Sequence, residues 1–200
     1  MTPNEVTEVF RSTGALLKGH FELRSKLHSD HYFQCALVLR YPRIAGRLCT
    51  ALVATMRQTL GSKLNVTGVI APAMGGLFVG HEIGRELDVM SLFVEKEDDK
   101  LVLRRGFTIN KGERYIVAED VITRGGRVQE TIDIVTQAGG EVVAVAVIVD
   151  RSGGKAHFAC PIFRLLAMEP VTWEPARCPL CAQGMPIEHP GSKNVTAQVV

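Results

Sequence analysis

Residues 114–126 read Arg-Tyr-Ile-Val-Ala-Glu-Asp-Val-Ile-Thr-Arg-Gly-Gly, and they give the strongest indication of how the chain folds. The apolar residues at its start predict a buried strand, two adjacent carboxylates follow, and a turn rich in threonine and glycine ends the stretch. Apolar residues then recur at helical spacing from Val128 to Ala138, and Gly139-Gly140 predicts the end of that helix. The sequence therefore predicts a strand, a turn and a helix, the unit from which parallel sheets are built.

The start of this predicted helix is suited to a phosphate group. The first backbone N–H groups of a helix have no partner within it, and the helix dipole favours an anion there. Glu119 and Asp120 would repel a phosphate, so we interpret them as acceptors for sugar hydroxyls or as direct or water-mediated partners of Mg²⁺. Together these groups predict a phosphorylated ribose as ligand. The alternative is an ordinary crossover turn, which also needs glycine and tolerates acids.

The rest of the chain alternates predicted strands and helices. Helices are expected at residues 5–17, 41–60, 77–87 and 128–138, and strands at 66–70, 89–94, 115–118, 142–149 and 163–167. Right-handed crossovers then give a parallel sheet covered on both faces. In such sheets ligands collect at the carboxyl ends of the strands. The loops after Ile70, Ala118 and Val149 fall there.

The composition is that of a single globular domain. A chain of 200 residues exceeds the size at which a core becomes easy to build and stays within the usual range of one domain. Its net charge of +2, with acids and bases interspersed, gives no footprint for nucleic acid or a membrane surface. No apolar run approaches the roughly 20 residues of a membrane span, and the N-terminus lacks a charged start followed by an apolar block. Five cysteines at irregular spacing fit a reducing compartment, so we expect a cytoplasmic protein.

The order acid-acid-apolar-apolar-Thr-x-Gly-Gly after an apolar strand resembles the phosphoribosyl diphosphate (PRPP) motif of type I phosphoribosyltransferases. Other segments narrow the resemblance to the orotate phosphoribosyltransferases, in their longer-tailed bacterial and archaeal form. Residues 19–23 and 27–39 resemble that family's substrate-proximal hairpin, and 103–107 the end of its mobile hairpin. Trp173-Glu174-Pro175, followed by Cys178-Pro179-Leu180-Cys181, resembles its tail.

Ala-Pro-Ala-Met-Gly-Gly at residues 71–76 resembles the family's second loop, which faces pyrophosphate. Glycines without a Cβ let a backbone approach a polyanion closely. Some family members place a lysine where this chain has Gly75, which leaves only backbone donors and the helix start here. An ordinary strand-to-helix turn is the alternative interpretation.

The resemblance implies a type I phosphoribosyltransferase fold. This is an α/β fold with a central, mainly parallel five-stranded sheet flanked by helices, a small hood and a mobile hairpin. It also implies one phosphoribosyltransferase domain over residues 1–200. Its parts would be an N-terminal hood segment at 1–40, the core sheet at 62–170 and a C-terminal tail at 171–200.

The implied activity is transfer of the phosphoribosyl group of PRPP to orotate, giving orotidine 5′-monophosphate and pyrophosphate in pyrimidine synthesis. The implied mechanism is displacement at the anomeric carbon through an oxocarbenium-like transition state, in which positioning and electrostatics supply the acceleration. Mg²⁺ is required and arrives with PRPP, with no certain protein ligand. The implied assembly is a homodimer whose subunits share the mobile loop, without nucleic acid or membrane partners.

Residue roles follow from position within the matched motifs. Asp120 and Lys96 are the implied catalytic residues. The expected PRPP contacts are Lys96, Glu119, Asp120, Val121, Ile122, Thr123, Arg124, Gly125, Gly126 and Arg127. Further cations of the mobile loop are Lys100, Arg104 and Arg105, although a hairpin of alternating charges is by default a solvated one.

The expected orotate contacts are Thr123, Arg151, Tyr32 and Phe33. The planar fork of Arg151 suits a carboxylate, although an arginine at a strand end is otherwise usually solvated. Tyr32 and Phe33 match an aromatic pair beside the pyrimidine, although aromatic residues in strands commonly belong to a core.

Four further positions depart from the family pattern. Arg124 and Arg127 stand where small or hydroxyl residues are common, Lys26 replaces a glycine, and Glu95 occupies a site that is often basic. Two other functions stay open: a phosphoribosyltransferase for another nucleobase, and a PRPP-sensing regulatory protein of the same fold. The second lacks an added helix-turn-helix or basic cluster for nucleic acid.

Cys178-x-x-Cys181 is half of a zinc ligand set, and the sequence has no second CxxC. Cys160, His157 and His189 are the candidates to complete a site by folding together. A redox CxxC normally opens a helix near the start of a thioredoxin-like unit, whereas this pair lies in a proline-rich tail. We therefore expect a structural tail with reduced thiols.

Overall fold

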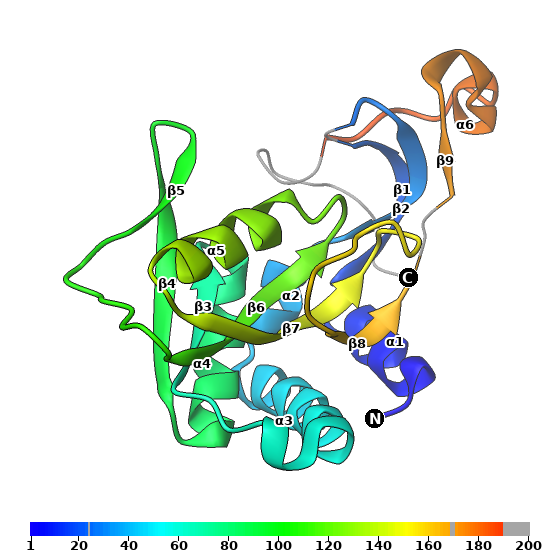
Figure 1. Cartoon of the computed structure of the whole chain (residues 1–200). Helices are drawn as coiled ribbons and strands as arrows, with labels where there is room; N and C mark the ends of the chain where they lie inside the picture. The colour runs from blue at the N-terminus through cyan, green and yellow to red at the C-terminus, as the bar shows by residue number, and fades with distance from the viewer. Residues whose placement is uncertain (24, 169–170, 190–200) are drawn as a thin grey trace.

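The computed structural model of the protein describes residues 1–23, 25–168 and 171–189. Its centre is a six-stranded sheet in the order β5-β4-β3-β6-β7-β8 (Figure 1). All neighbouring strands are parallel except β5, which pairs antiparallel with β4. The predicted parallel sheet of five strands is confirmed, and β5 adds a sixth strand at one edge. The bounds are β3 Gly68–Pro72, β4 Met90–Glu97, β5 Lys100–Leu103, β6 Arg114–Ile122, β7 Glu141–Asp150 and β8 Ile162–Ala167.

Helices cover both faces of this sheet because the side chains of each strand alternate between two apolar clusters. In β6, Ile116 and Ala118 join the cluster that contains residues of α1, α3 and α4, whereas Tyr115 and Val117 join the one that contains residues of α5. Figure 1 shows α5 on the opposite side of the sheet from α3 and α4. The bounds are α1 Pro3–Ser12, α2 Cys35–Leu39, α3 Pro42–Leu60, α4 Gly75–Leu87 and α5 Gly126–Gln137.

A second, smaller sheet has the order β1-β2-β9 and joins the two ends of the chain. Its first two strands form an antiparallel hairpin in the predicted hood segment, and β9 of the predicted tail pairs with β2. Residues 190–200 of that tail lie outside the described residues. The remaining bounds are β1 Leu16–Glu22, β2 His28–Phe33, η1 Gly61–Lys63, β9 Thr172–Trp173, η2 Pro175–Arg177 and α6 Pro179–Ala182.

The helix predicted at residues 5–17 is too long, since α1 ends at Ser12. Gly14 has a φ of +69°, in the left-handed region where a helix ends. The following Leu16 and Leu17 are buried in β1 instead of extending the helix. A short apolar run does not by itself distinguish a strand from a helix, and that ambiguity explains the error.

Strand β6 extends four residues beyond the predicted end at Ala118. Val121 pairs with Val149 and Ile122 with Asp150, so the ladder with β7 continues past the two acids. Glu119 and Asp120 consequently lie within the last residues of strand β6 and not in a loop. A strand holds side chains more rigidly than a loop does, because neighbouring strands fix its backbone.

None of the described helices combines the length and apolar composition that a bilayer span requires.

Candidate active site

The turn after β6 presents backbone N–H groups at the start of α5. Gly125 precedes the helix with a φ of +79°, and a Cβ there would lie 2.9 Å from Cζ of Phe158. Glycine meets both constraints because it has no Cβ. Thr123 and Arg124 are exposed at the turn. Since glycine has no side chain with which to cap the helix, the first N–H groups of α5 are left for an anion.

Glu119 and Asp120 lie side by side at the end of β6 in different surroundings. Glu119 is 4% exposed, whereas Asp120 is half-buried. The backbone N–H of Asp120 donates to Glu119 Oε1 at 3.1 Å, and that of Val121 donates to Asp120 Oδ1 at 2.9 Å. Burial raises the pKa of Glu119 well above its usual range, the charge of Asp120 raises it further, and Arg127 lowers it by a smaller amount. Burial thus favours a protonated Glu119, which can donate a hydrogen bond as well as accept one.

The connection from β3 into α4, including the first two residues of that helix, lies directly against these two carboxyl groups. A Cβ on Gly75 would overlap the Asp120 carboxylate, and a Cβ on Gly76 would lie 2.9 Å from Glu119 Oε1. Glycine is thus required at both positions because the backbone there lies so close to the two carboxyl groups. The two loops that the sequence placed at separate strand ends form one surface.

Arg127 joins the same two loops. Its guanidinium donates to the carbonyl oxygen of Ala73 at 3.1 Å, although the side chain stays exposed. This arginine is one of the departures from the family pattern, and the structure gives it a bracing role between the turn after β6 and the loop after β3. Its backbone N–H remains in the first turn of α5.

Arg151 directly follows β7, at the carboxyl ends of the parallel strands, where Glu119 and Asp120 also lie. Its backbone N–H donates to the carbonyl of Ile122 at 2.8 Å, and its guanidinium carbon lies 5.7 Å from the ring centroid of Phe33. Burial lowers the pKa of Arg151, and Tyr32 and Cys35 raise it. The Nε atom is buried and has no hydrogen-bond partner among the described residues. A buried donor without a partner is costly, and a ligand oxygen would satisfy it.

Cys35 was missed by the sequence analysis and lies between the two halves of the site. It is 2% exposed at the start of α2. Burial raises the pKa of its thiol, Asp120 and Glu119 raise it further, and Arg151 lowers it. A side chain that senses both carboxylates and this arginine shows that the ends of β6 and β7 converge near α2. Its position just after Phe33-Gln34 is the one sequence signal that could have drawn attention to it.

The basic residues of the predicted mobile loop lie on the hairpin of β4 and β5, which projects from the rest of the sheet in Figure 1. Lys96 forms an ion pair with Asp99 across the turn. Nη1 of Arg104 lies 3.0 Å from Oε1 of Glu97, and Nε of Arg105 lies 2.7 Å from Oε1 of Glu95. Lys100 pairs in register with Glu97. Among the described residues, the ion pairs of Lys96, Arg104 and Arg105 therefore stay within the hairpin, and none joins Asp120.

The tail cysteines have partners other than those that the sequence suggested. Cys178 and Cys181 meet His20 and His28 of the first hairpin. His189 lies 3.6 Å from Glu22 instead, and Cys160 packs against the cluster that contains residues of α5. Among the described residues, none of the three candidates Cys160, His157 and His189 belongs to this set of four. The histidines of the hairpin lie about 150 residues away along the chain, a distance over which spacing rules carry no information.

Comparison with known proteins gives the class of this site. A model of the phosphoribosyl transferase domain family matches residues 43–180. Solved structures share the fold: an orotate phosphoribosyltransferase from Aeropyrum pernix has a TM-score of 0.69 and 23% identity over 82% of this chain and 94% of that one. An adenine phosphoribosyltransferase from Rhodothermus marinus has a TM-score of 0.62 and 19% identity over 82% and 99%. The chain belongs to the phosphoribosyltransferase family.

Within that family the chain is similar to orotate phosphoribosyltransferases over nearly its whole length. The one from Heliobacterium modesticaldum is 47% identical over 96% of this chain and 100% of its own. The one from Acidithiobacillus ferrooxidans is 47% identical over 98% of this chain and 100% of its own. The resemblance inferred from the motifs is confirmed.

Proposed function

We propose that the protein transfers the phosphoribosyl group of PRPP to orotate, which yields orotidine 5′-monophosphate and pyrophosphate in pyrimidine synthesis. The observation that carries the proposal is the convergence of two unlike surfaces near Cys35. One surface has the carboxyl groups of Glu119 and Asp120 beside a free helix start, which suits a phosphorylated sugar. The other has Arg151 over the ring of Phe33, which suits a flat anionic base.

PRPP is held mainly by the turn after β6. The N–H groups from Thr123 to Arg127 surround the 5′-phosphate, and the helix dipole of α5 adds to their effect. Val121 and Ile122 complete the strand that fixes the turn against β7. Asp120 and Glu119 bind the ribose hydroxyls, to which a carboxylate accepts and a protonated carboxyl can also donate.

Mg²⁺ fits this arrangement because it prefers oxygen ligands and keeps several of its waters. The carboxyl oxygens of Glu119 and Asp120 lie next to Gly75 and Gly76 at the start of α4, where a Cβ on either glycine would fill the space. Direct or water-mediated contacts from these two carboxyls would hold the ion with PRPP. When bound, the ion neutralises charge on the departing pyrophosphate.

Orotate is held by Arg151 together with Tyr32, whereas the predicted contact Phe33 is 3% exposed within the apolar core and supports Arg151 from behind. The guanidinium meets the carboxylate through two parallel N–H···O bonds, a geometry that lysine does not provide. Phe33 already lies under the guanidinium and Tyr32 lies within its electrostatic reach. Thr123, exposed at the turn, can contact both orotate and the ribose phosphate.

The reaction then needs little proton transfer by the protein. Orotate N1 forms a bond to the anomeric carbon and gives up its proton to the departing pyrophosphate or to water, while the bond to pyrophosphate breaks and its electron pair leaves with pyrophosphate. The Asp120 carboxylate stabilises the ribose as positive charge develops on it, Glu119 holds a ribose hydroxyl, and the N–H groups near Gly75 face the developing negative charge. The catalytic contribution is orientation and electrostatics in a site closed to water.

Lys96 acts on the pyrophosphate of a neighbouring subunit in this proposal, so the active unit is a homodimer. The support is that the hairpin projects from its own sheet and that Asp99, the ion-pair partner of Lys96 among the described residues, is 91% exposed. Arg104, Arg105 and Lys100 accompany it. All five cysteines are free thiols, in keeping with the proposed cytoplasmic location.

One assay tests the proposed function. Purified protein is mixed with PRPP, Mg²⁺ and orotate, and the loss of orotate absorbance is followed beside parallel reactions with uracil, hypoxanthine and adenine. Consumption of orotate alone, with pyrophosphate release, is expected. Preference for another base would indicate a different phosphoribosyltransferase. Binding of PRPP without turnover of any base would favour a regulatory protein.

A further inference from the structure

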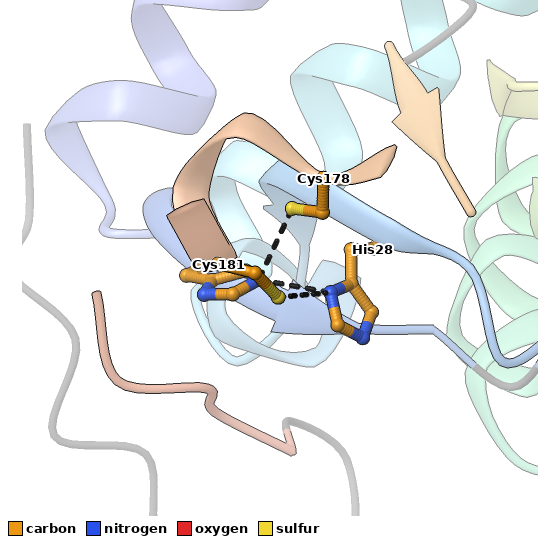
Figure 2. Close-up of side chains that lie close together, drawn as sticks. His28, Cys178 and Cys181 are labelled. Carbon is orange, nitrogen blue, oxygen red and sulfur yellow. Dashed lines mark hydrogen bonds between the residues drawn. The ribbon is translucent and has the colours of Figure 1, made fainter. Parts of the chain in front are cut away.

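Four side chains with metal-ligating atoms meet beside the smaller sheet. His20 lies in β1, His28 begins β2, and Cys178 and Cys181 come from the start of α6. One ring nitrogen or sulfur atom from each lies within 4.8 Å of the other three. In Figure 2 the labelled side chains of His28, Cys178 and Cys181 point toward one another. The proposed transferase reaction uses none of them.

We propose that these four side chains bind one Zn²⁺ ion in a closed tetrahedral site. Zinc is bound at about 2.3 Å by cysteine sulfur and about 2.0–2.1 Å by histidine nitrogen, so a tetrahedron keeps sulfur and nitrogen about 3.5 Å apart. The structure has Cys178 Sγ to His20 Nε2 at 3.4 Å, Cys181 Sγ to His20 Nε2 at 3.7 Å and Cys181 Sγ to His28 Nδ1 at 3.3 Å. The two ring nitrogens are 3.0 Å apart, close to the tetrahedral value of about 3.3 Å.

The outer hydrogen bond of His20 supports this assignment. Its Nδ1 lies 2.8 Å from the carbonyl oxygen of Met185, and since a carbonyl only accepts, Nδ1 carries the proton. Nε2 therefore directs its lone pair toward His28 and the two sulfurs. A ligating histidine commonly donates its other N–H to a carbonyl in this way, which fixes the ring and its tautomer.

The distances also favour one ion over an iron–sulfur cluster. In a two-iron cluster with two cysteines and two histidines, each pair binds a different iron, which separates sulfur from nitrogen. Here Cys181 lies within 3.7 Å of a nitrogen of each histidine. With thiolate and imidazole ligands and no open position, Zn²⁺ is the expected ion and its role is structural.

The tail has a physical need for such a link. Neither apolar cluster includes a described residue beyond Met168, so the segment that follows has no core of its own. Its described backbone contacts are a two-residue pairing of β9 with β2 and the hydrogen bonds of Glu188 with the first hairpin. Small segments without a core are usually held by a metal or a disulfide. The ion would hold the tail to the hairpin that carries Tyr32 and Phe33.

The β1–β2 hairpin is built to supply the two histidines. Glu22 pairs with His28, and the ladder is irregular between Lys18 and Phe21, the stretch that contains His20. Such a bulge redirects a side chain. His20 and His28 are 1% and 2% exposed, and the hydrogen-bond partners of their rings among the described residues are each other, the Met185 carbonyl and the two cysteine sulfurs. A cation between them explains this burial.

Metal analysis tests the proposal on the full-length protein, purified without a polyhistidine tag or chelator. Elemental mass spectrometry is expected to find one zinc per chain. The double variant Cys178→Ser/Cys181→Ser is expected to lose it. The matched controls are Cys160→Ser and His189→Gln, since these residues carry the same ligand chemistry outside the cluster, and both are expected to retain one zinc.

A second measurement applies if the double variant does not fold. Zinc is removed from the wild-type protein with a chelator, and Co²⁺ is then added. A tetrahedral dithiolate site gives intense visible bands and a thiolate-to-cobalt band in the near ultraviolet, and these should saturate at one Co²⁺ per chain. Trypsin should cut after the exposed Arg177 faster in the metal-free protein than in the zinc protein. Return of the slow rate on adding zinc would support the structural role.

Three results would overturn the proposal. The first is wild-type protein that contains only traces of zinc and gives no thiolate-to-cobalt band. The second is a folded double variant that keeps its zinc. The third is a Cys178–Cys181 disulfide, found by mass spectrometry of alkylated protein from reducing cells, which would make the pair a redox site.

Discussion

The Cα atom of Gly75 lies so close to the Asp120 carboxylate that a Cβ on residue 75 would overlap both carboxylate oxygens. This contact fixes the distance between the loop after β3 and the end of β6. A longer side chain at residue 75, such as the lysine of some relatives, would have to displace Asp120 or move the loop. The glycine therefore belongs to the geometry of the carboxyl pair.

We expect Gly75→Ala to reduce kcat/KM by at least about tenfold, because the added methyl moves an oriented carboxylate out of position. Steady-state kinetics with orotate and PRPP checks it. Gly46→Ala is the matched control, since the atoms nearest to a Cβ on this α3 glycine would be the side-chain ends of Arg85 and Glu82. Equal activity of the two variants would show that the loop adjusts freely.

Asp120→Asn should lower turnover by about a hundredfold or more, the range expected when an oriented polar contact in the transition state is lost. The variant keeps the shape of the side chain, so folding should be unchanged by circular dichroism. Asp133→Asn, at an exposed position on α5, is the control and should retain full activity. A correctly folded Asp120 variant with wild-type turnover would contradict the ribose assignment.

Arg151→Ala should raise the KM for orotate far more than the KM for PRPP, because only orotate presents a carboxylate to that guanidinium. The KM of Arg151→Lys for orotate should lie between those of the wild type and Arg151→Ala, since lysine keeps the charge but lacks the planar fork. Initial rates over a grid of both substrates separate the two constants. Equal rises in both constants would remove Arg151 from the orotate site.

The local parts of this site could be read from the sequence, whereas the contacts between them could not. An apolar strand, two acids and a glycine turn are consecutive residues, so their order alone predicts β6, the turn and α5. The approach of Gly75 to Asp120 depends on how two crossovers pack. Cys35 is equally hidden, since nothing in its own segment shows that Asp120 and Arg151 come near it.

The tail shows the same limit more sharply. Cys178-x-x-Cys181 indicated half of a metal site because the two residues are only three positions apart in the sequence. Its other half, His20 and His28, comes from the opposite end of the chain and is brought there by the pairing of β9 with β2. The ion pairs of the hairpin were also beyond prediction, since alternating charges allow many pairings of similar energy.

Glu119 should make the stability of the ligand-free protein fall as pH rises. Its unfolded pKa is about 4.3, and burial raises the folded value. Between the two, the folded protein binds a proton that the unfolded chain has lost, so the free energy of unfolding falls by up to about 1.4 kcal/mol per pH unit. Glu119→Gln removes this dependence. Urea unfolding from about pH 5 to pH 8 should show the variant gaining on wild type as pH rises. A constant difference would refute the raised pKa. Glu141→Gln, at an exposed carboxyl, should show no such trend.

The last prediction concerns the shared loop. Lys96 stands on a hairpin that projects from its own sheet, and in this chain its ion-pair partner is Asp99. If the hairpin serves the neighbouring subunit, Lys96→Ala and Asp120→Asn damage different parts of a site built from two chains. Each variant alone should be nearly inactive, because each of its sites carries one lesion. Mixed and allowed to exchange, the two variants should regain activity.

The size of that recovery follows from two-fold symmetry. Random exchange makes about half of the dimers mixed, and in each mixed dimer one site combines an intact hairpin with an intact Asp120 while the other carries both lesions. Activity should therefore approach about a quarter of wild type. Exchange is confirmed by native mass spectrometry of subunits with tags of different mass. Complete exchange without recovery would place Lys96 in its own subunit's site or outside catalysis, and a monomeric wild-type protein with full activity would reject the shared site altogether.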